Sequence, residues 1–207
     1  KIKKSYSYTN GKLIIKLGNL LKCPLRVWIK TSDEELKINF DKINPVLLNS
    51  ETDTVITFEK NIKTVNKITF ASRLGNVEKK IKPVKLELPF PKGRKYNIIQ
   101  GNNTNHTHNT DWSRYAVDFN LKINDTICSA TSGFVVGVID KYKYGGKGNE
   151  WKPYGNFITI YDPSSGFFTQ YVHLTESGSF VKLGESIERG QPIGLSGMTG
   201  QTDTAHI

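Results

Sequence analysis

Short runs of β-branched and aromatic residues dominate the first part of this chain. The clearest are KLIIKL (12–17), RVWIKT (26–31), TVITFE (54–59) and KITFAS (67–72). Runs of this length and composition predict strands. Turn signals stand beside the first and the last run, at Asn10-Gly11 and Gly75-Asn76. No helix of ten or more residues is predicted, and several short strands over 1–88 favour an immunoglobulin-like β-sandwich.

A proline-rich stretch, LPFPKG at 88–93, separates this part from the rest. Pro89 and Pro91 cannot continue a central strand, because each lacks a backbone N–H. Beyond them the predicted strands are YAVDFNL (115–121), GFVVGVID (133–140), NFITIYD (156–162) and FFTQYVHL (167–174). Segment 142–152 predicts an exposed loop, and the frequent glycines of 178–200 suit tight corners. We therefore expect an all-β chain, with a sandwich over 1–88 and a compact antiparallel β domain over 89–207.

The composition is that of a globular protein, with 37% hydrophobic and 11% aromatic residues. No apolar run approaches the roughly 20 residues that cross a bilayer, so no transmembrane segment is predicted. The first ten residues carry no signal-peptide pattern. Because the chain starts without Met and stops abruptly at Ile207, we expect both ends to have been cut and a leader to have been removed.

The net charge of +10 is concentrated in the first part of the chain. Residues 1–88 hold 18 Lys and Arg against 9 Asp and Glu, a surplus of +9, whereas residues 89–207 hold 11 against 10, a surplus of +1. Such a surplus either forms a solvated lysine-rich surface or attracts an anionic polymer. Nucleic acid is not predicted as a partner, because no Arg-rich cluster or interleaved aromatic motif accompanies the lysines.

The two cysteines fall one in each half, at Cys23 and Cys128, and form no CxxC pair. This spacing argues against a cysteine zinc site or a redox centre. A bridge between them is allowed in an exported protein, but two buried free thiols are favoured.

The histidines indicate where the chemistry lies. All four of them, His106, His108, His173 and His206, occur in the second half of the chain. Histidine is the side chain most used for metal ligation and for proton transfer near neutral pH. The second domain is therefore the candidate site of function, and the first domain is expected to serve spacing or binding.

Three segments of the second domain contain motifs that resemble those of one known protein family. The stretch QGNNTNHTHNTDWSRYAVDFN (100–120) resembles the QG-x-N … SH … RYAVDF signature of one branch of the lysostaphin/LytM zinc endopeptidases. In that branch a loop His and the Asp of the next strand bind zinc, and the matching residues are His108 and Asp118. NFITIYD followed by QYVHL resembles the strand pair whose His acts in catalysis, here His173. GESIERGQPIGLSGMTGQTDTAHI resembles the terminal motif, whose first HxH histidine is His206.

The resemblance covers 88–207 and, more loosely, the β domain before it. It implies a LytM-type peptidase domain, a Zn2+ cofactor held by His108 and Asp118, and catalysis by His173 and His206. It further implies hydrolysis of the peptide cross-links of bacterial peptidoglycan in the cell envelope, by a periplasmic or secreted protein. His106 remains a rival ligand to His108, because alternation in an extended segment puts both on one side. The third ligand is expected directly after Ile207, so the domain is expected to be truncated there.

Three nearby features have weaker interpretations. Tyr154-Gly155-Asn156 belongs either to the substrate groove or to a turn. Asp162 stands before a Pro-Ser-Ser-Gly turn and predicts turn chemistry. Asp111 is a candidate acceptor for the ring of His108, since ligating imidazoles usually have one.

Two other functions compete with the peptidase. One is a catalytically inactive LytM-like module that binds cell wall or regulates other cell-wall hydrolases; retention of His108, Asp118, His173 and His206 argues against it. The other is a lipoyl- or biotinyl-type carrier, favoured by the glycine rhythm of VKLGESIERGQPIG. A carrier needs a lysine on an exposed hairpin, and the segment Ser196–Gly200 offers none.

Overall fold

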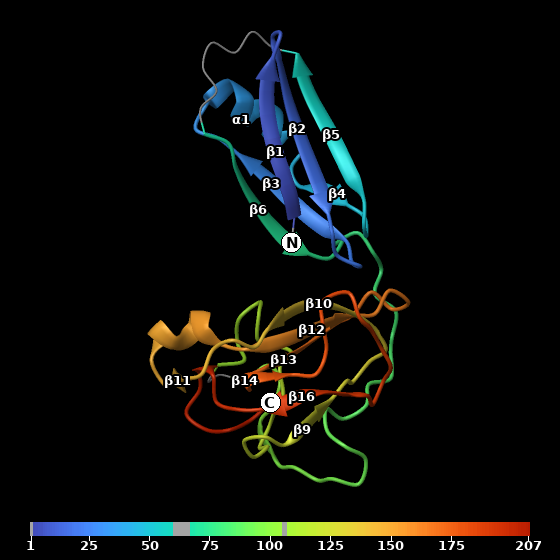
Figure 1. Cartoon of the computed structure of the whole chain (residues 1–207), viewed down its shortest axis with the longest axis vertical. Helices are drawn as coiled ribbons and strands as arrows, with labels where there is room; N and C mark the ends of the chain where they lie inside the picture. The colour runs from blue at the N-terminus through green and yellow to red at the C-terminus, as the bar shows by residue number, and fades with distance from the viewer. Residues whose placement is uncertain (1, 60–66, 105–106) are drawn as a thin grey trace. The chain divides into compact units, whose positions relative to one another are not determined.

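The structure, a computed structural model, describes residues 2–59, 67–104 and 107–207 (Figure 1). It separates into two compact units, Lys1–Ile81 and Lys82–Ile207. The elements of the first unit are β1 Ile2–Thr9, β2 Lys12–Asn19, β3 Leu25–Lys30, α1 Glu34–Asp41, β4 Val46–Leu48, β5 Asp53–Glu59 and β6 Thr69–Leu74. Those of the second are β7 Ile98–Gln100, β8 Asp118–Phe119, β9 Thr126–Cys128, β10 Gly133–Ile139, β11 Gly145–Gly146, η1 Asn149–Tyr154, β12 Phe157–Tyr161, β13 Phe168–Val172, β14 Leu174–Ser179, β15 Ser186–Ile187, β16 Pro192–Ser196 and β17 Gly200–Gln201.

The first unit contains two three-stranded antiparallel sheets, seen as two layers in Figure 1, in the orders β1-β2-β5 and β4-β3-β6. The turn between β1 and β2 is the predicted Asn10-Gly11, whose φ angles of 51° and 75° suit a two-residue hairpin of type I′. Every second residue of β2 and of β3 is buried: Leu13, Ile15, Leu17, Leu25, Val27 and Ile29. These alternating faces form the core of the unit.

The helix α1 covers part of this core and has a conventional start. The carboxylate of Asp33 accepts a hydrogen bond from the Leu36 backbone N–H at 2.9 Å, which satisfies one free donor of the first turn. The helix buries Leu36 and Phe40. Its eight residues agree with the prediction that no helix reaches ten.

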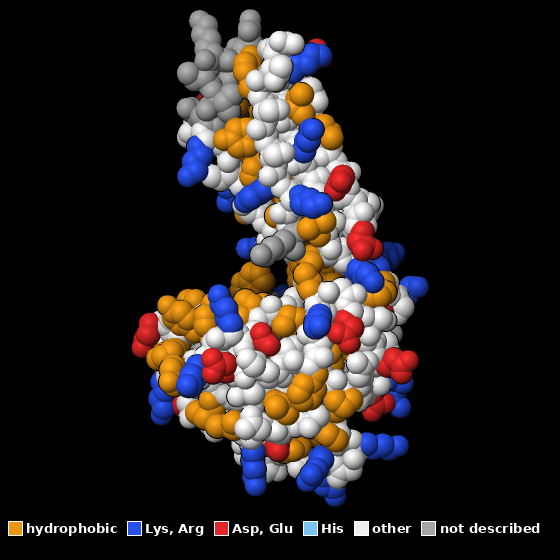
Figure 2. All heavy atoms as spheres, viewed as in Figure 1, with side chains coloured by type: hydrophobic (Ala, Val, Ile, Leu, Met, Phe, Trp, Pro, Cys, Tyr) orange, Lys and Arg blue, Asp and Glu red, His pale blue; other side chains and the backbone are white. Residues whose placement is uncertain are grey.

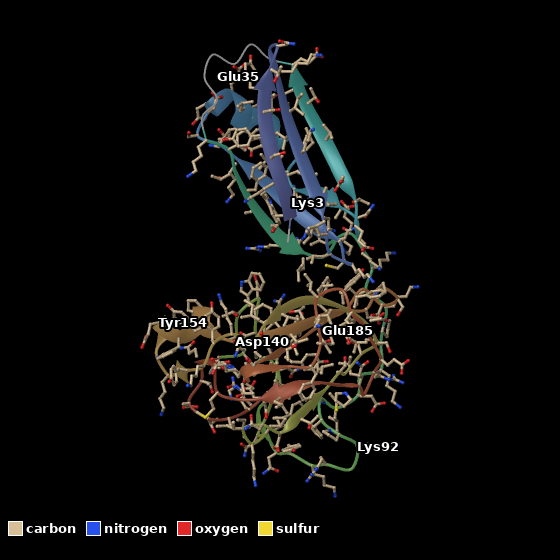
Figure 3. The ribbon with its side chains drawn as sticks, viewed as in Figure 1. Lys3, Glu35, Lys92, Asp140, Tyr154 and Glu185 are labelled. Atoms are coloured by element: carbon tan, nitrogen blue, oxygen red, sulfur yellow. The ribbon has the colours of Figure 1, made fainter. Side chains whose placement is uncertain are left out.

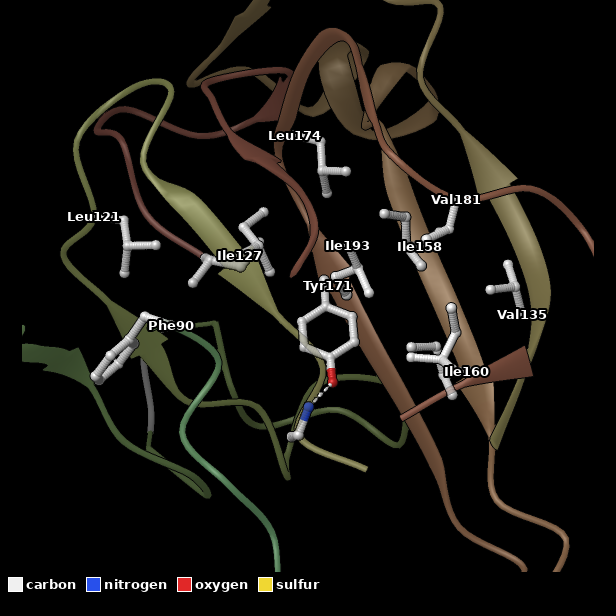
Figure 4. Close-up of a cluster of buried hydrophobic side chains, with 13 residues drawn as sticks. Phe90, Leu121, Ile127, Val135, Ile158, Ile160, Tyr171, Leu174, Val181 and Ile193 are labelled. Carbon is white, nitrogen blue, oxygen red and sulfur yellow. Dashed lines mark hydrogen bonds between the residues drawn. The ribbon is translucent and has the colours of Figure 1, made fainter. Parts of the chain in front are cut away.

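The second unit is built from small sheets around one apolar cluster, part of which Figure 4 shows. The strand orders are β13-β12-β10-β15, β14-β16-β9 and β7-β8, all antiparallel, with a parallel pair of β11 and β17. Ile127, Ile158, Ile160 and Leu174 are fully buried in the cluster. The Tyr171 hydroxyl accepts a hydrogen bond from the Ala130 N–H at 2.6 Å, so this buried polar group is satisfied.

The segment before the predicted domain boundary is bonded to the second unit. The Lys82 N–H donates to Ser165 O at 3.0 Å, and the Glu87 N–H donates to Ala130 O at 3.0 Å. The boundary after residue 88 and the roles given to the two domains stay predictions.

The predicted all-β class is confirmed, with α1 the one α-helix in the described part of the chain. The immunoglobulin-like topology of the first unit stays a prediction. Cys23 and Cys128 are buried free thiols, as favoured from the sequence, and burial raises the pKa of Cys23 to about 12. No helix among the described residues is both long and apolar enough to pass through a membrane.

Candidate active site

Four segments of the second unit bring one carboxylate and three imidazoles together. His108 lies in the loop before β8, Asp118 begins β8, His173 stands between β13 and β14, and His206 belongs to the last residues. His108 Nε2 is 3.1 Å from Asp118 Oδ1, and His206 Nε2 is 3.9 Å from Asp118 Oδ2. The ring centroids of His173 and His206 are 4.6 Å apart. These four side chains therefore form one cluster.

Backbone pairing explains why the C-terminal residues reach Asp118. Phe119, the neighbour of Asp118, exchanges two hydrogen bonds with Ile207, with N···O distances of 2.9 and 3.1 Å. On its other side, His206 forms an antiparallel bridge with Gly197. The last residues thus lie between β8 and the end of β16, which brings the His206 ring beside the Asp118 carboxylate.

In all three imidazoles the Nδ1 atom contacts a backbone carbonyl. Its distance is 2.9 Å to Gly101 O for His108, 2.7 Å to Thr199 O for His173, and 3.0 Å to Thr204 O for His206. A carbonyl oxygen only accepts, so each Nδ1 carries a proton and donates it. In the neutral rings Nε2 then has a free lone pair. The backbone therefore orients three Nε2 atoms as bases or ligands.

The contact between His108 and Asp118 fits a bound cation. With Nδ1 protonated, a neutral His108 ring points a lone pair at a carboxylate oxygen only 3.1 Å away. Two acceptors at this distance repel each other unless a proton or a metal ion lies between them. The two side chains are only 6% and 16% exposed, so water screens this repulsion poorly. Imidazole nitrogen and carboxylate oxygen are ligands that zinc accepts.

His108 and Asp118 alone are too few ligands for a catalytic metal ion. Within residues 2–59, 67–104 and 107–207, no group of three or more His, Cys, Asp or Glu side chains is arranged to hold a metal ion. A catalytic zinc takes three protein ligands. The rival ligand His106 lies outside the described residues, so the choice between it and His108 stays a prediction.

His173 is held in an unusual backbone conformation and in a dry environment. Its φ of 63° lies in the left-handed region, which non-glycine residues rarely adopt and which recurs at functional sites. Burial lowers the pKa of His173 to about 4; its hydrogen bond to Thr199 O opposes this shift, and the nearby His206 adds to it. The His173 ring is therefore neutral near pH 7.

Two residues hold His173 in place: Thr199, which has no role in the sequence analysis, and Asn156, which is assigned there to the groove or to a turn. Thr199, whose carbonyl accepts from His173, also donates its hydroxyl to Leu174 O at 2.7 Å. The same hydroxyl accepts from the Asn156 N–H at 3.0 Å. The Asn156 amide donates to Leu174 O and Thr175 O, both at 3.2 Å, and to Tyr142 O at 2.8 Å. Asn156 thus ties the chain at Tyr142 to the chain at Leu174 and Thr175, and the groove and turn interpretations of Tyr154-Gly155-Asn156 stay predictions.

The prediction for Asp111 is wrong, and that for Asp162 is confirmed. Asp111 is highly exposed and pairs with Arg114 at 3.4 Å, whereas the acceptor for the His108 ring is Gly101 O. Asp162 accepts from the backbone N–H of Ser164 at 2.9 Å, which is an Asx turn. The hydrogen bonds of Ser164 and Ser165 outweigh burial and lower the pKa of Asp162.

An aromatic group adjoins the part of the chain that Asn156 anchors. The Tyr142 and Tyr154 rings meet edge to face at 5.4 Å, and Trp151 meets Tyr154 at 6.0 Å. Figure 3 labels Tyr154, whose side chain is 45% exposed at the end of η1. The backbone of Tyr142 is bonded to Asn156 in both directions. This group is therefore fixed to the same scaffold as His173.

Comparison with known proteins relates this β unit and its cluster to peptidases. Residues 113–207 match the model of peptidase family M23. The peptidoglycan DD-endopeptidase ShyA of Vibrio cholerae is 41% identical over 56 residues, which are 27% of this chain and 12% of ShyA. A protein of Buchnera aphidicola named as an uncharacterized metalloprotease is 30% identical over 128 residues, 60% of this chain and 30% of that protein. The chain thus spans less than a third of either relative.

Two solved structures show the same kind of similarity. The catalytic domain of the antimicrobial peptidase lysostaphin from Staphylococcus simulans is 25% identical, with 61% of this chain and 75% of that chain covered and a TM-score of 0.37. A zinc-containing peptidase from Vibrio cholerae is 16% identical, with 99% and 79% covered and a TM-score of 0.41. The predicted resemblance to lysostaphin/LytM-type peptidases is confirmed by the family match. The match covers 113–207, the part of the second unit that holds Asp118, His173 and His206.

Proposed function

We propose that this chain is part of a zinc-dependent endopeptidase that hydrolyses peptide bonds of bacterial peptidoglycan in the cell envelope. The observation that carries the proposal is the buried pair of His108 Nε2 and Asp118 Oδ1 at 3.1 Å, with two further imidazoles beside it. The match of 113–207 to the model of family M23 supports a peptidase, and the activity in the name of ShyA supports peptidoglycan as the substrate class.

His108 and Asp118 are the residues that would hold the zinc ion. The hydrogen bond from His108 Nδ1 to Gly101 O keeps Nε2 directed at the carboxylate. When bound, zinc supplies a Lewis acid that polarises the scissile carbonyl. A catalytic zinc takes three protein ligands, and His108 and Asp118 would supply two of them.

His173 and His206 would act as proton carriers and not as ligands. The neutral His173 ring, held by Thr199 O, has a free Nε2 that can accept a proton from the attacking water. The same ring, once protonated, can pass the proton to the leaving amine. Once protonated, His206 can donate a hydrogen bond to the oxygen that becomes negative as water adds. Neighbouring imidazoles whose centroids are 4.6 Å apart can share these steps.

The test uses the full-length protein and purified peptidoglycan. We expect about one zinc per chain, release of peptides from the wall, loss of both after chelation, and recovery on re-addition of zinc. Protein that binds the wall but holds no zinc and releases no peptide would be the inactive LytM-like module. Zinc-loaded protein that cleaves other peptides but leaves peptidoglycan intact would contradict the substrate class and retain the peptidase.

A further inference from the structure

The outward face of one sheet in the first unit gathers cations around a tryptophan. In β3 the residues Leu25, Val27 and Ile29 point into the core, so Arg26, Trp28 and Lys30 point outward. Across the β3–β6 pairing, Arg26 lies opposite Arg73, Trp28 opposite Ala71 and Lys30 opposite Thr69. Opposed residues share a face of the sheet. Two arginines that lie far apart in the sequence are therefore neighbours beside one indole.

The two guanidinium groups are held against the indole ring. The Cζ atoms of Arg26 and Arg73 lie 5.6 and 6.0 Å from the centroid of Trp28, which is cation–π distance. Arg26 also donates from Nε to Gly75 O at 3.1 Å and from Nη2 to Leu74 O at 3.2 Å. These contacts fix its charge in place before any ligand arrives. Ala71, opposite Trp28, is too small to cover the half-buried indole.

A cavity of about 550 Å³ continues from Trp28. It exists because β4 pairs only with the first half of β3. Beyond Val27 the Asn44 side chain replaces a strand, accepting from Ile29 N–H at 2.9 Å and donating to Ile29 O at 2.8 Å. The helix α1 then forms the far wall, with Lys37 and Asp41 among the lining residues. The volume lies within the range of small-molecule sites.

The charge of this region is strongly positive. Lys30 and Lys37 line the cavity, Arg26 and Arg73 adjoin it, and Asp41 is the one carboxylate among the lining residues. In the described part of the chain neither lysine takes part in an ion pair. Lysine and arginine side chains also lie on the face of the unit that Figure 2 shows. At the cavity an aromatic ring and a concave wall accompany the charge.

We propose that Trp28 and this cavity bind an anionic glycan. The apolar C–H face of a pyranose ring packs on the exposed part of the indole, as an apolar surface does on an aromatic face. Carboxylate or phosphate groups of the same polymer contact Arg73, Lys30 and Lys37. Single-stranded nucleic acid is disfavoured, because such sites stack successive bases on several aromatics and this face offers one. The site is separate from the proposed peptidase chemistry and does not depend on it.

The binding test uses the full-length protein and an oligogalacturonate, a chain of pyranoses that each carry a carboxylate. Calorimetric titration should detect binding that weakens with salt, and the neutral glucose polymer dextran should bind at least about tenfold more weakly. Trp28→Ala should weaken oligogalacturonate binding by about tenfold or more, the scale of a lost stacking contact. Lys37→Gln, on the surface of α1, should weaken it a few-fold without disturbing the core.

The matched control is Lys16→Gln, an equal loss of charge on β2 in the other sheet. It should leave affinity unchanged. Equal weakening by Lys16→Gln and Lys37→Gln would overturn the site, because charge alone would then explain binding. Binding of dextran as tight as that of oligogalacturonate would show that the ligand need not be an anion, which would overturn the proposal. Tighter binding of a single-stranded DNA oligomer, lost in Trp28→Ala, would replace the glycan with nucleic acid. If Lys37→Gln unfolds at the same temperature as the parent protein, weaker binding by this variant cannot be attributed to misfolding.

Discussion

The two units are both β structures, but they place their polar residues in opposite ways. The first unit contains no histidine and carries its cations outside, and two of them, Arg26 and Arg73, contact Trp28. The second has a nearly balanced charge and places three imidazoles and one carboxylate together, with His108 only 5% exposed. Surface charge acts at long range and suits holding a polymer. A buried cluster of imidazoles and a carboxylate acts at bond distances and suits a reaction. The two units are therefore predicted to have separate functions, binding in the first and catalysis in the second. Substitutions in one unit should leave the function of the other unchanged.

The largest effect is expected from Asp118→Asn, which keeps the shape of the side chain but removes its charge. A neutral amide is a poor zinc ligand, so we expect zinc content and peptide release to fall to background. Metal analysis of the full-length variant is the measurement. The control is Asp111→Asn, a nearby exposed carboxylate outside the cluster, which should keep zinc. Full zinc occupancy in Asp118→Asn would remove this residue from the metal site.

The next effect separates the ligands from the proton carriers. His173→Gln should retain zinc and lose about 100- to 10,000-fold in turnover, the usual contribution of a general acid–base. Zinc content and the rate of peptide release, measured on one preparation, test this split. Turnover at the parental rate would show that His173 carries no proton in the reaction.

Burial of His173 also predicts that metal-free protein loses stability in acid. Its pKa is about 4 in the folded chain, against an ordinary value of 6.5 in the unfolded chain. Between these values the unfolded state binds more protons, so the free energy of unfolding decreases as pH falls from 6.5 to 4. The loss attributable to this ring is at most about 3 kcal/mol. Urea unfolding of the parent and of His173→Gln should differ by this slope, and parallel pH profiles would contradict it.

A smaller effect is expected from the residues that position His173. Asn156→Ala removes the amide donor to Tyr142 O and Thr175 O and one of the two side-chain donors to Leu174 O, and should lower the free energy of unfolding by about 1–3 kcal/mol. It should also release the His173 ring, so Nδ1 and Nε2 would exchange the proton. Nitrogen NMR of metal-free protein should detect a fixed Nδ1–H tautomer in the parent and a mixture in the variant. A fixed tautomer in Asn156→Ala would show that Asn156 stabilises the fold but does not position the His173 ring.

The smallest effect is expected in the first unit, where the direction of the change in binding tests the proposed glycan site. Asp41→Asn removes the one carboxylate that lines the Trp28 cavity. It should therefore strengthen oligogalacturonate binding by about two- to threefold, the scale of one exposed charge interaction. Titration of parent and variant at the same low salt measures the change. Weaker binding in the variant would mean that Asp41 contacts the ligand directly.

The sequence predicted the parts of the fold that depend on local pattern. The strands β2, β3, β5, β10 and β12 follow runs of apolar and β-branched residues, and Asn10-Gly11 gave the first hairpin because both positions need positive φ. The strand β1 was missed, since IKKSYSYT is mostly exposed and carries little periodicity. The run at 115–121 was predicted as a strand, but only Asp118 and Phe119 are paired.

The residues of the candidate site also divide into those that the sequence predicted and those that it did not. His108, Asp118, His173 and His206 stand in recognisable motifs, so resemblance could nominate them. Asn156 and Thr199 bind backbone atoms 14 to 43 residues away in sequence, which no local pattern reveals. The positive φ of His173 and the pairing of Arg26 with Arg73 likewise come from tertiary contacts. Sequence motifs therefore identify the reacting side chains, whereas the residues that hold them in place can be identified only from the folded structure.

The most direct test of the central claim is an anomalous-scattering crystal structure of the full-length, zinc-loaded protein. We predict a zinc peak about 2.0–2.2 Å from both His108 Nε2 and an Asp118 oxygen, with His173 and His206 nearby and outside ligand distance. A peak held by His106 in place of His108 would change one ligand. A peak held by His173, or one away from Asp118, would contradict the account.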